Sequence, residues 1–336
     1  MNQVTQPSRA LAEPTLSVVI VAWNIWELLL PCLQALYECA REVEFEVIVV
    51  DNASSDGTVE AIRQRFPDVV LIENTENVGF PKANNQALPL TRGRYVLYLN
   101  PDTEVGPGTI DACIAELDRD PGIGMVGCRL VLPDGNIQYG CARNPYLLRH
   151  LTAELLWLHM IFPRSRVFAH HLIGDWDHRD TRDVEAICGA FMMVRRSVAE
   201  ALGGLPDELF MYHDDAAFCL RVRRAGWRIR YLADVWTKHY FQQSTEKSAA
   251  RMYLLECEGK LRLIREGQGA VHAAIARFLF GVRAIVRAIV AAMGVLVPGF
   301  GRVTARYPGV FHLERHAFQF LWALAPASTM RRFFRP

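Results

Sequence analysis

The first hundred residues alternate between short apolar runs and stretches with helical character. Four runs rich in β-branched or aromatic residues predict buried strands at Leu16–Ala22, Phe45–Val50, Val69–Glu73 and Tyr95–Leu99. The intervening stretches predict helices at Glu27–Ala40, Thr58–Phe66 and Pro81–Leu88. This alternation predicts an α/β fold, Rossmann-like, with a mainly parallel sheet flanked by helices.

Polar residues follow three of the four predicted strands. Trp23 and Asn24 follow the first strand, residues 51–58 the second, and residues 100–103 the fourth. Carboxyl ends of parallel strands meet at one edge of an open sheet, and ligands bind there. We therefore expect these three loops to form one binding edge. The alternative for the second loop is that it only caps the next helix.

The loop after the fourth strand predicts a metal site. Pro101 cannot continue a strand, so Asp102 should lie at the strand's carboxyl end. A carboxylate flanked by Asn100 and Thr103 offers the hard oxygen ligands that Mg²⁺ or Mn²⁺ prefers when it holds a diphosphate. Taken alone, Asn-Pro-Asp is also an ordinary turn sequence.

Composition limits the functional classes. The chain has 336 residues, is 51% hydrophobic and has a net charge of +1, so a large core is expected and a nucleic-acid-binding surface is not. Its eight cysteines are scattered without a CxxC pair, which disfavours zinc ribbons and disulfide scaffolds and fits a reducing compartment. Residues 1–14 lack an apolar signal core and predict a disordered leader.

The second half of the chain continues with mixed elements. The pattern predicts strands at Gly124–Leu132, Ala186–Val194 and Trp227–Tyr231, and a helix at Arg195–Leu202. Asp-Gly within Pro133–Asn136 predicts a hairpin turn, and Leu147–Phe162 predicts an apolar helix. In Ala186–Val194, Gly189 and Ala190 leave room for a substrate.

Two adjacent carboxylates, Asp214 and Asp215, belong to the segment Phe210–Asp215, which opens a predicted helix that runs to Arg224. Acids at a helix N-terminus stabilise it by capping and by interacting with its dipole. The same pair could supply a general base, because one ionised carboxylate raises the pKa of the other. The residues alone leave both interpretations open.

Histidines give two further candidates. His170 and His171 are adjacent and have no third ligand nearby in the sequence, so a surface or acceptor-loop role is favoured over metal binding. His239 follows the last predicted strand, and a lone histidine is more often structural than a ligand.

The motifs together resemble a known family. SVVIVAWN, VIVVDNASSDGT, NVGFPKANNQAL, YVLYLNPDTEV, VGCRLVLPDGNIQYG and CGAFMMVRRSVAEALGGLPDELFMYHDDAAFCLRVRRAGWRIRYLADVWTKHYFQQS occur in the order typical of inverting family 2 glycosyltransferases of the GT-A fold. The spelling of the metal motif is similar to that of the rhamnosyltransferase-like branch. The resemblance implies a catalytic domain at 15–246, with a nucleotide-sugar half at 15–105 and an acceptor half at 106–246 that contains a variable insert at 141–184.

The resemblance also implies roles for individual residues. Asp51 would hold a uracil or thymine base, beside Trp23 and Asn24. The ribose, diphosphate and donor sugar would contact Asn77, Gly79, Lys82, Asn84, Asn85 and Asn100. The last of these replaces the first acid of the usual Asp-x-Asp motif.

Catalytic roles follow in the same way. Asp102 and His239 would ligate the Mg²⁺ or Mn²⁺ ion. Asp215 would be the general base for direct displacement, and Asp214 would orient or contact the acceptor.

The region at 247–336 is expected to be helical, basic and amphipathic. From residue 270 onward there are nine arginines and one acid, Glu314, and apolar residues dominate Ala270–Val297 and Phe311–Leu324. Ser248–Arg265 predicts a helix. Arginines interrupt the apolar run before it reaches membrane-spanning length, which favours a helix lying in the membrane surface with its arginines toward anionic lipid. The alternative is packing on the catalytic domain or on a second subunit, so a homo-oligomer stays open.

The sequence therefore predicts a glycosyltransferase at the inner face of the cell membrane. It would move a sugar from dTDP-rhamnose or a UDP-sugar to a hydroxyl of a glycan or lipid-linked glycan. One alternative is a non-catalytic GT-A-fold protein that binds a nucleotide sugar or serves as a scaffold. A nucleotidyltransferase is disfavoured because residues 23–26 lack the Gly-rich, basic phosphate loop expected after the first strand.

Overall fold

The computed structural model describes residues 3–4, 13–173, 175–240 and 249–296. The chain forms two compact units. The first comprises Met1–Pro145 and His171–Ser244, and the second comprises Tyr146–His170 and Thr245–Pro336. Residues 146–170, expected within the acceptor insert, thus belong with the C-terminal helices. The predicted functional division of the chain remains a prediction.

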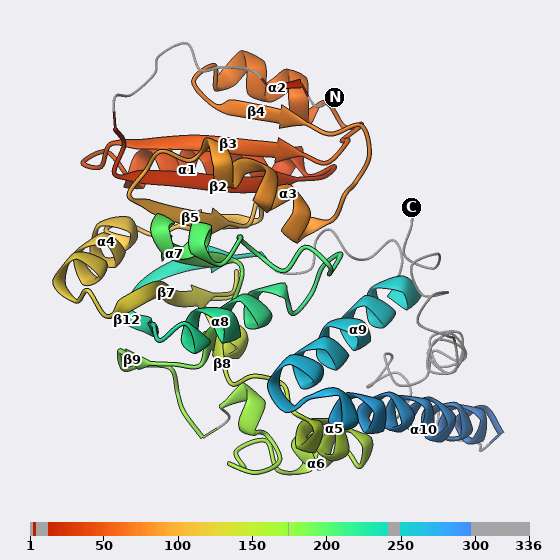
Figure 1. Ribbon diagram of the computed structural model, residues 1–336. Helices are drawn as coiled ribbons and strands as arrows, with labels where there is room; N and C mark the ends of the chain where they lie inside the picture. The colour runs from red at the N-terminus through yellow and green to blue at the C-terminus, as the bar shows by residue number, and fades with distance from the viewer. Residues whose placement is uncertain (1–2, 5–12, 174, 241–248, 297–336) are drawn as a thin grey trace. The chain divides into compact units, whose positions relative to one another are not determined.

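The first unit is built on a large mixed sheet (Figure 1). Its strands are β1 (Gln3–Val4), β2 (Leu16–Ala22), β3 (Phe45–Asp51), β4 (Val70–Glu73), β5 (Tyr95–Leu99), β6 (Thr103–Val105), β7 (Ile123–Val131), β9 (Arg182–Asp183), β11 (Phe191–Arg195) and β12 (Arg228–His239). The order is β1-β4-β3-β2-β5-β11-β7-β12-β6, with β9 pairing with β12. β4, β3, β2 and β5 are parallel neighbours, as the alternating pattern predicts. β11 is antiparallel to both of its neighbours.

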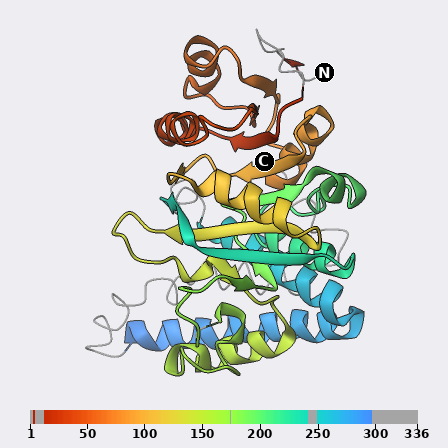
Figure 2. The same ribbon diagram turned by 90° about the vertical axis from the view of Figure 1, so that its left-hand side faces the viewer.

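Helices cover both faces of this sheet. They are α1 (Trp26–Cys39), α2 (Thr58–Arg65), α3 (Phe80–Ala87), α4 (Thr109–Arg119), α7 (Arg196–Ala201) and α8 (Asp214–Arg224), with 3₁₀ turns at Leu88–Leu90 and Tyr139–Cys141. In Figure 1, α3 lies in front of β2 and β3, and α1 lies behind them. Figure 2 shows the long strands β7 and β12 side by side. The central strands are fully buried, which explains their continuous apolar sequences.

Several predicted elements were wrong in detail. The leader contributes β1, which pairs with β4, so Gln3 and Val4 are not disordered. The expected strand at Ala186–Val194 is two strands in different sheets, β10 (Ala186–Ile187) and β11. β10 pairs with β8 (Ala142–Arg143) in a separate two-stranded sheet. The strand expected at Trp227–Tyr231 extends to His239, because β7, β6 and β9 all pair along it.

The second unit is helical. Its elements are α5 (Leu148–Leu155), α6 (Leu158–Ile161), α9 (Ala249–Gln268) and α10 (Ala270–Leu296), and a 3₁₀ turn at His170–Leu172 begins in it. The single helix expected at Leu147–Phe162 is therefore two, separated by Trp157, whose φ of 53° lies in the left-handed region. Gly269, with φ of 96°, makes the turn between α9 and α10.

A buried ionic cluster joins three helices of this unit. Glu154 of α5 contacts Lys260 of α9 at 3.1 Å and Arg283 of α10 at 2.7 Å. Arg283 is only 2% exposed. The expectation that the α10 arginines face lipid is thus wrong for Arg283, because Glu154 holds its guanidinium inside.

The outer face of α10 is apolar instead. Val271, Ile275, Phe278, Ile285 and Ile289 are all exposed, and their spacing places them on one side of the helix. We call these five residues the α10 stripe. In the part of the chain that the structure describes, no helix combines the length and apolar character needed to cross a membrane. The segment Phe311–Leu324 lies outside the described residues.

Candidate active site

Asp51 ends β3 at the edge where the parallel strands terminate, paired in register with Ala22 of β2. It is 2% exposed. Its Oδ2 accepts the backbone N–H of Ser54 at 2.9 Å, whereas its Oδ1 is buried and has no hydrogen-bond partner within the described residues. Burial raises the pKa of Asp51, and the bonds from Ser54 act in the opposite direction. A buried acceptor without a partner suits a ligand N–H donor.

The loop after β2 is bonded to the loop after β3. The N–H of Asn24 donates to Oγ of Ser54 at 2.9 Å, and Oδ1 of Asn24 accepts the N–H of Ser55 at 2.7 Å. Asn24 has φ of 49°, which asparagine tolerates better than most residues. Trp23 next to it is 44% exposed, so its ring is available at the edge. The structure thus brings Trp23, Asn24 and Asp51 together.

The start of α3 approaches the segment before α8. Oδ1 of Asn77 accepts the N–H of Gly79 at 3.0 Å, and the N–H of Phe80 donates to the carbonyl of Phe210 at 2.8 Å. A Cβ on Gly79 would lie 2.6 Å from that carbonyl oxygen, and its φ is 90°. Glycine is therefore required here for close packing between the two halves of the fold.

Three predicted donor contacts on α3 have different surroundings. The amide of Asn84 donates to the carbonyl of Phe80 at 2.9 Å, and the amide of Asn85 bonds both backbone groups of Leu205. Through these hydrogen bonds both asparagines stabilise the local backbone. Lys82 is exposed. Contacts of Lys82, Asn84 and Asn85 with a donor remain predictions.

Asp102 and His239 lie together at the end of the sheet. β6 pairs with the end of β12, with His239 opposite Thr103, and Nε2 of His239 is 3.3 Å from Oδ1 of Asp102. Both side chains are buried. Asn100, at the end of β5, bonds the carbonyl of Ala190 through its backbone N–H. The family resemblance, rather than the local sequence pattern, led us to expect that these residues would meet.

Gln138 orients the histidine. Its Oε1 lies 2.8 Å from Nδ1 of His239 and can only accept, so Nδ1 carries the proton. In a neutral imidazole, Nε2 then presents a lone pair to the Asp102 carboxylate. Two acceptors facing each other suit a shared cation, and ligating histidines usually donate their other N–H in this way.

The geometry fits a small divalent ion. Two ligands at right angles around an octahedral ion with bonds of about 2.1 Å lie about 3 Å apart, close to the Asp102–His239 separation. Within the described residues no group of three His, Cys, Asp or Glu side chains could hold a metal. Mg²⁺ typically takes one or two protein ligands and completes its shell with phosphate oxygens and water.

The carboxylate pair begins α8. Tyr212 and His213 precede it with φ of 68° and 60°, two consecutive non-glycine residues in the left-handed region. Such backbone strain is concentrated at functional sites. Asp214 and Asp215 are both buried. Burial, followed by the charge of Asp215, raises the pKa of Asp214 to about 7.

Asp215 is held by groups that the sequence did not reveal. Its Oδ1 contacts the guanidinium of Arg143, and its Oδ2 accepts the N–H of Gly189 at 2.8 Å. Arg143 and Gln138 are both site residues missed by the sequence analysis. Neither belongs to a short motif with a metal-binding or catalytic spacing, and each reaches its partner only through the folded sheet.

His170 lies with basic side chains. Its ring stacks on His150 with centroids 5.5 Å apart, and the guanidinium of Arg149 is 2.9 Å from its Nδ1. The surface or acceptor-loop role of His170 and His171 remains a prediction.

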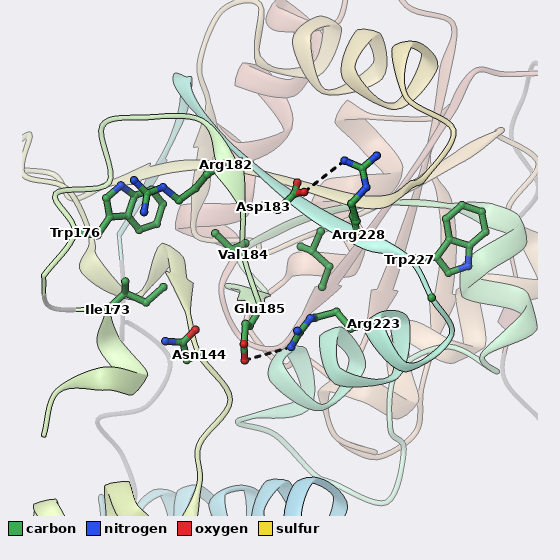
Figure 3. Close-up of a pocket in the computed structure, with 12 residues that line it drawn as sticks. Asn144, Ile173, Trp176, Arg182, Asp183, Val184, Glu185, Arg223, Trp227 and Arg228 are labelled. Atoms are coloured by element: carbon green, nitrogen blue, oxygen red, sulfur yellow. Dashed lines mark hydrogen bonds and ion pairs between the residues drawn. The ribbon is translucent and has the colours of Figure 1, made fainter. Parts of the chain in front are cut away.

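A separate pocket of about 440 Å³ lies where β12 begins, at the opposite end of that strand from His239 (Figure 3). Its lining includes Trp176, Arg182, Asp183, Glu185, Arg223 and Arg228. The charged groups are paired with one another: Arg223 with Glu185 at 3.2 Å, and Arg228 with Asp183 at 3.4 Å. Trp176 is covered by Arg182, whose guanidinium lies 4.4 Å from its ring centroid. None of the predicted site residues lines this pocket.

The sequence model of the family "Glycosyl transferase family 2" matches residues 17–203, more than half of the chain. The chain belongs to glycosyltransferase family 2. It is thus a transferase, and the predicted resemblance to the rhamnosyltransferase-like branch is confirmed.

Relatives of this glycosyltransferase support that placement. It is 29% identical over 225 residues to an N-acetylglucosaminyl-diphospho-decaprenol L-rhamnosyltransferase of Mycobacterium tuberculosis, covering 63% of this chain and 71% of the relative. It is 27% identical to the O-antigen biosynthesis protein RfbC of Myxococcus xanthus, covering 70% of this chain but 18% of that longer protein.

A solved structure shows the same fold. The mannosyltransferase PcManGT from Pyrobaculum calidifontis, in complex with GDP-Man and Mn²⁺, superposes with a TM-score of 0.56 at 19% identity, covering 95% of this chain and 90% of that one. The predicted α/β fold of GT-A type is thereby confirmed.

Proposed function

We propose that this glycosyltransferase transfers a sugar from a pyrimidine nucleoside diphosphate to a hydroxyl of a glycan or lipid-linked glycan, with inversion. The observation that carries this proposal is the pairing of Asp102 with His239 at 3.3 Å, at the edge where Asp51 also lies. That edge would receive the donor, within the proposed nucleotide-sugar half at 15–105. The acceptor half would comprise residues 106–246.

Asp51 would select the base. Its Oδ1, which has no hydrogen-bond partner within the described residues, can accept the N3–H of uracil or thymine, and the ring of Trp23 is exposed beside it. The activity for which the mycobacterial relative is named supports a rhamnosyl donor and a lipid-linked acceptor. dTDP-rhamnose is therefore the first donor to test.

Asp102 and His239 would hold Mg²⁺ or Mn²⁺. Bound there, the ion would supply positive charge against the leaving diphosphate. Asp215 would accept the proton of the acceptor hydroxyl, and Asp214 would orient the acceptor. Direct displacement needs no protein nucleophile.

Contact with a membrane surface would use the α10 stripe rather than Arg283. Exposed apolar patches of this kind mark interaction sites. The excess of arginine in the sequence after residue 270 favours an anionic surface. This arrangement would suit a peripheral enzyme at the inner face of the cell membrane that uses a lipid-linked acceptor.

The proposal is tested by thermal shift with a panel of nucleotide sugars, with and without Mn²⁺. A ligand that binds only the folded protein raises the unfolding midpoint. We expect dTDP- or UDP-sugars to raise it in a Mn²⁺-dependent way, and GDP- and ADP-sugars to do so much less. Product formation with the best donor then tests transfer. Binding without any transfer or donor hydrolysis would favour the non-catalytic, nucleotide-sugar-binding alternative.

Gln138→Ala tests whether His239 is a metal ligand, in the product-formation assay at varied Mn²⁺ concentration. Loss of a residue that orients a metal ligand typically costs 10–100-fold in metal affinity or activity. We expect about that increase in the Mn²⁺ concentration needed for half-maximal activity. Tyr139→Ala, at the exposed neighbouring residue, is the matched control and should leave the Mn²⁺ requirement unchanged. Equal Mn²⁺ requirements for Gln138→Ala and wild type would argue against His239 as a ligand.

A further inference from the structure

Arg143 reaches Asp215 across 72 residues of sequence. It lies on β8, which pairs with β10 through Arg143 and Ala186. Its side chain is 22% exposed and that of Asp215 is 11% exposed, so the ion pair is largely shielded from water. A charge pair in this setting restricts both side chains more than a surface pair does.

The segment that leaves the same small sheet supplies a second contact. Gly189 lies two residues after the end of β10, and its N–H donates to Oδ2 of Asp215 at 2.8 Å. A Cβ on Gly189 would lie 3.2 Å from the Cβ of Asp215. Oδ1 of Asp215 is thus held from β8 by Arg143, and Oδ2 is held by Gly189 just after β10. The backbone N–H of Ala216 adds a third bond, to Oδ1, at 2.6 Å.

The Arg143–Asp215 pair differs from a structural pair in the same unit. Arg92 bonds Glu46 through both Nε and Nη2, at 2.8 and 2.6 Å, which is a saturated two-point contact. Arg143 touches Asp215 through Nη2, and its Nε is buried without a partner within the described residues. The guanidinium of Arg143 therefore contacts one oxygen of Asp215, and its Nε–H remains available as a donor beside the carboxylate pair.

We propose that Arg143 is a positioning residue of the transfer reaction, which holds the Asp215 carboxylate in the orientation that receives the acceptor proton. This inference rests on the proposed function. In the transfer, the acceptor oxygen bonds to the anomeric carbon as its proton passes to Asp215. The bond from that carbon to the diphosphate oxygen breaks, and its electron pair leaves with the nucleoside diphosphate. Arg143 stays charged throughout, because guanidinium does not lose its proton in proteins.

The test compares Arg143→Gln, Arg143→Lys and Arg92→Gln with wild type in full-length protein. A misplaced catalytic group can cost about 10²-fold. We expect Arg143→Gln to lower kcat about 10²-fold and to change the donor KM less than about threefold, and Arg143→Lys to recover part of the loss. Arg92→Gln, which breaks an ion pair with a buried glutamate elsewhere in the unit, should lower the unfolding temperature without a comparable loss of kcat.

A double-mutant cycle separates positioning from general structural damage. If Arg143 acts through Asp215, adding Arg143→Gln to Asp215→Asn should change kcat little, because coupled residues are not additive. The acid limb of the pH–rate profile gives a second readout. Arg143 lowers the pKa of Asp214, so Arg143→Gln should move any Asp214-dependent limb to higher pH.

Two results would overturn the inference alone: a kcat for Arg143→Gln within threefold of wild type, or an equal loss in the wild-type and Asp215→Asn backgrounds. A wild-type enzyme that transfers no sugar from any pyrimidine donor would instead overturn the proposed function, and this inference with it. Unfolding midpoints and donor-induced shifts of every variant show whether it is folded and binds donor.

Discussion

The two units each bury a carboxylate cluster, and the clusters differ in charge balance. In the first unit, the buried carboxylates of Asp214 and Asp215 lie near one cation, Arg143, which forms an ion pair with Asp215. In the second, Glu154 alone contacts two cations, Lys260 and Arg283. Glu256, which is partly exposed, also pairs with Lys260 at 2.8 Å and completes the balance.

This difference separates the proposed catalytic pair from a cluster with a structural role. The Glu154 cluster is neutral when all four groups are charged, so no proton needs to enter or leave. The Asp214–Asp215 pair carries one carboxylate more than its cation compensates. Burial, followed by the charge of Asp215, raises the pKa of Asp214 to about 7. An acid with a raised pKa, next to a second buried acid and strained backbone, is typical of a catalytic site. The Glu154 cluster instead connects α5, α9 and α10.

The largest expected effect is on activity at the first cluster. Asp215→Asn keeps the shape of the side chain but cannot accept the acceptor proton, and general-base catalysis contributes about 10²–10⁴-fold. We expect kcat to fall by about 10³-fold while the donor-induced rise in unfolding midpoint is kept. Asp134→Asn, in the exposed turn after β7, should retain wild-type kcat. If Asp215→Asn kept more than a tenth of wild-type kcat, Asp215 would not be the general base, and the proposed catalytic role of the first cluster would be wrong.

The next effect is on stability at the second cluster. Glu154→Gln leaves Arg283 and Lys260 buried without their shared anion, and breaking a buried ion pair in this way costs about 3–5 kcal/mol. We expect a loss of that size in the free energy of unfolding of the region containing α5, α9 and α10, measured by urea titration with hydrogen exchange.

Glu256→Gln is the matched control for that measurement, because Glu256 contacts Lys260 from a more exposed position. A partly exposed pair contributes little, about 0–1 kcal/mol. Equal losses for Glu154→Gln and Glu256→Gln would show that burial does not distinguish the two acids.

The edge that carries Asp51 and Asp102 could be predicted because these residues closely follow apolar runs. The bounds of β2 and β5 agree with the predicted strands to the residue. Asp51 is the last residue of β3, one residue beyond the predicted end, and Asp102 lies three residues after β5. Local sequence therefore sets both the strand and the position of the carboxylate after it.

The acceptor side could be predicted only in part, because its contacts join distant residues. Gln138 meets His239 across 101 residues, and nothing in a continuous apolar run such as 186–194 marks the break at which Gly189 turns its N–H toward Asp215. Arg283 was misjudged for a similar reason. An arginine in an apolar helix is interpreted as facing outward unless its buried partner, here Glu154, is known.

The smallest expected effect concerns pH and again contrasts the two clusters. The folded protein favours protonated Asp214, because burial and the charge of Asp215 raise its pKa from its ordinary value to about 7. The stability from this group is therefore complete below the unfolded pKa, near 4, and is lost as pH rises through about 7. The loss has a limiting slope of about 1.4 kcal/mol per pH unit between those values.

Asp214→Asn removes this ionisation, since an amide does not titrate. We expect the free energy of unfolding of Asp214→Asn minus that of wild type to increase by about 1–3 kcal/mol from pH 5 to pH 7 and to level off above it. Asp215→Asn should weaken the same pH dependence in a protein that retains Asp214, because it removes one cause of the raised pKa. Unfolding free energies from urea titrations at pH 5, 6, 7 and 8 measure both. A difference that is constant with pH would mean that Asp214 has the same pKa in the folded protein as in the unfolded chain. The excess negative charge that distinguishes this cluster from that of Glu154 would then not shift the pKa of Asp214.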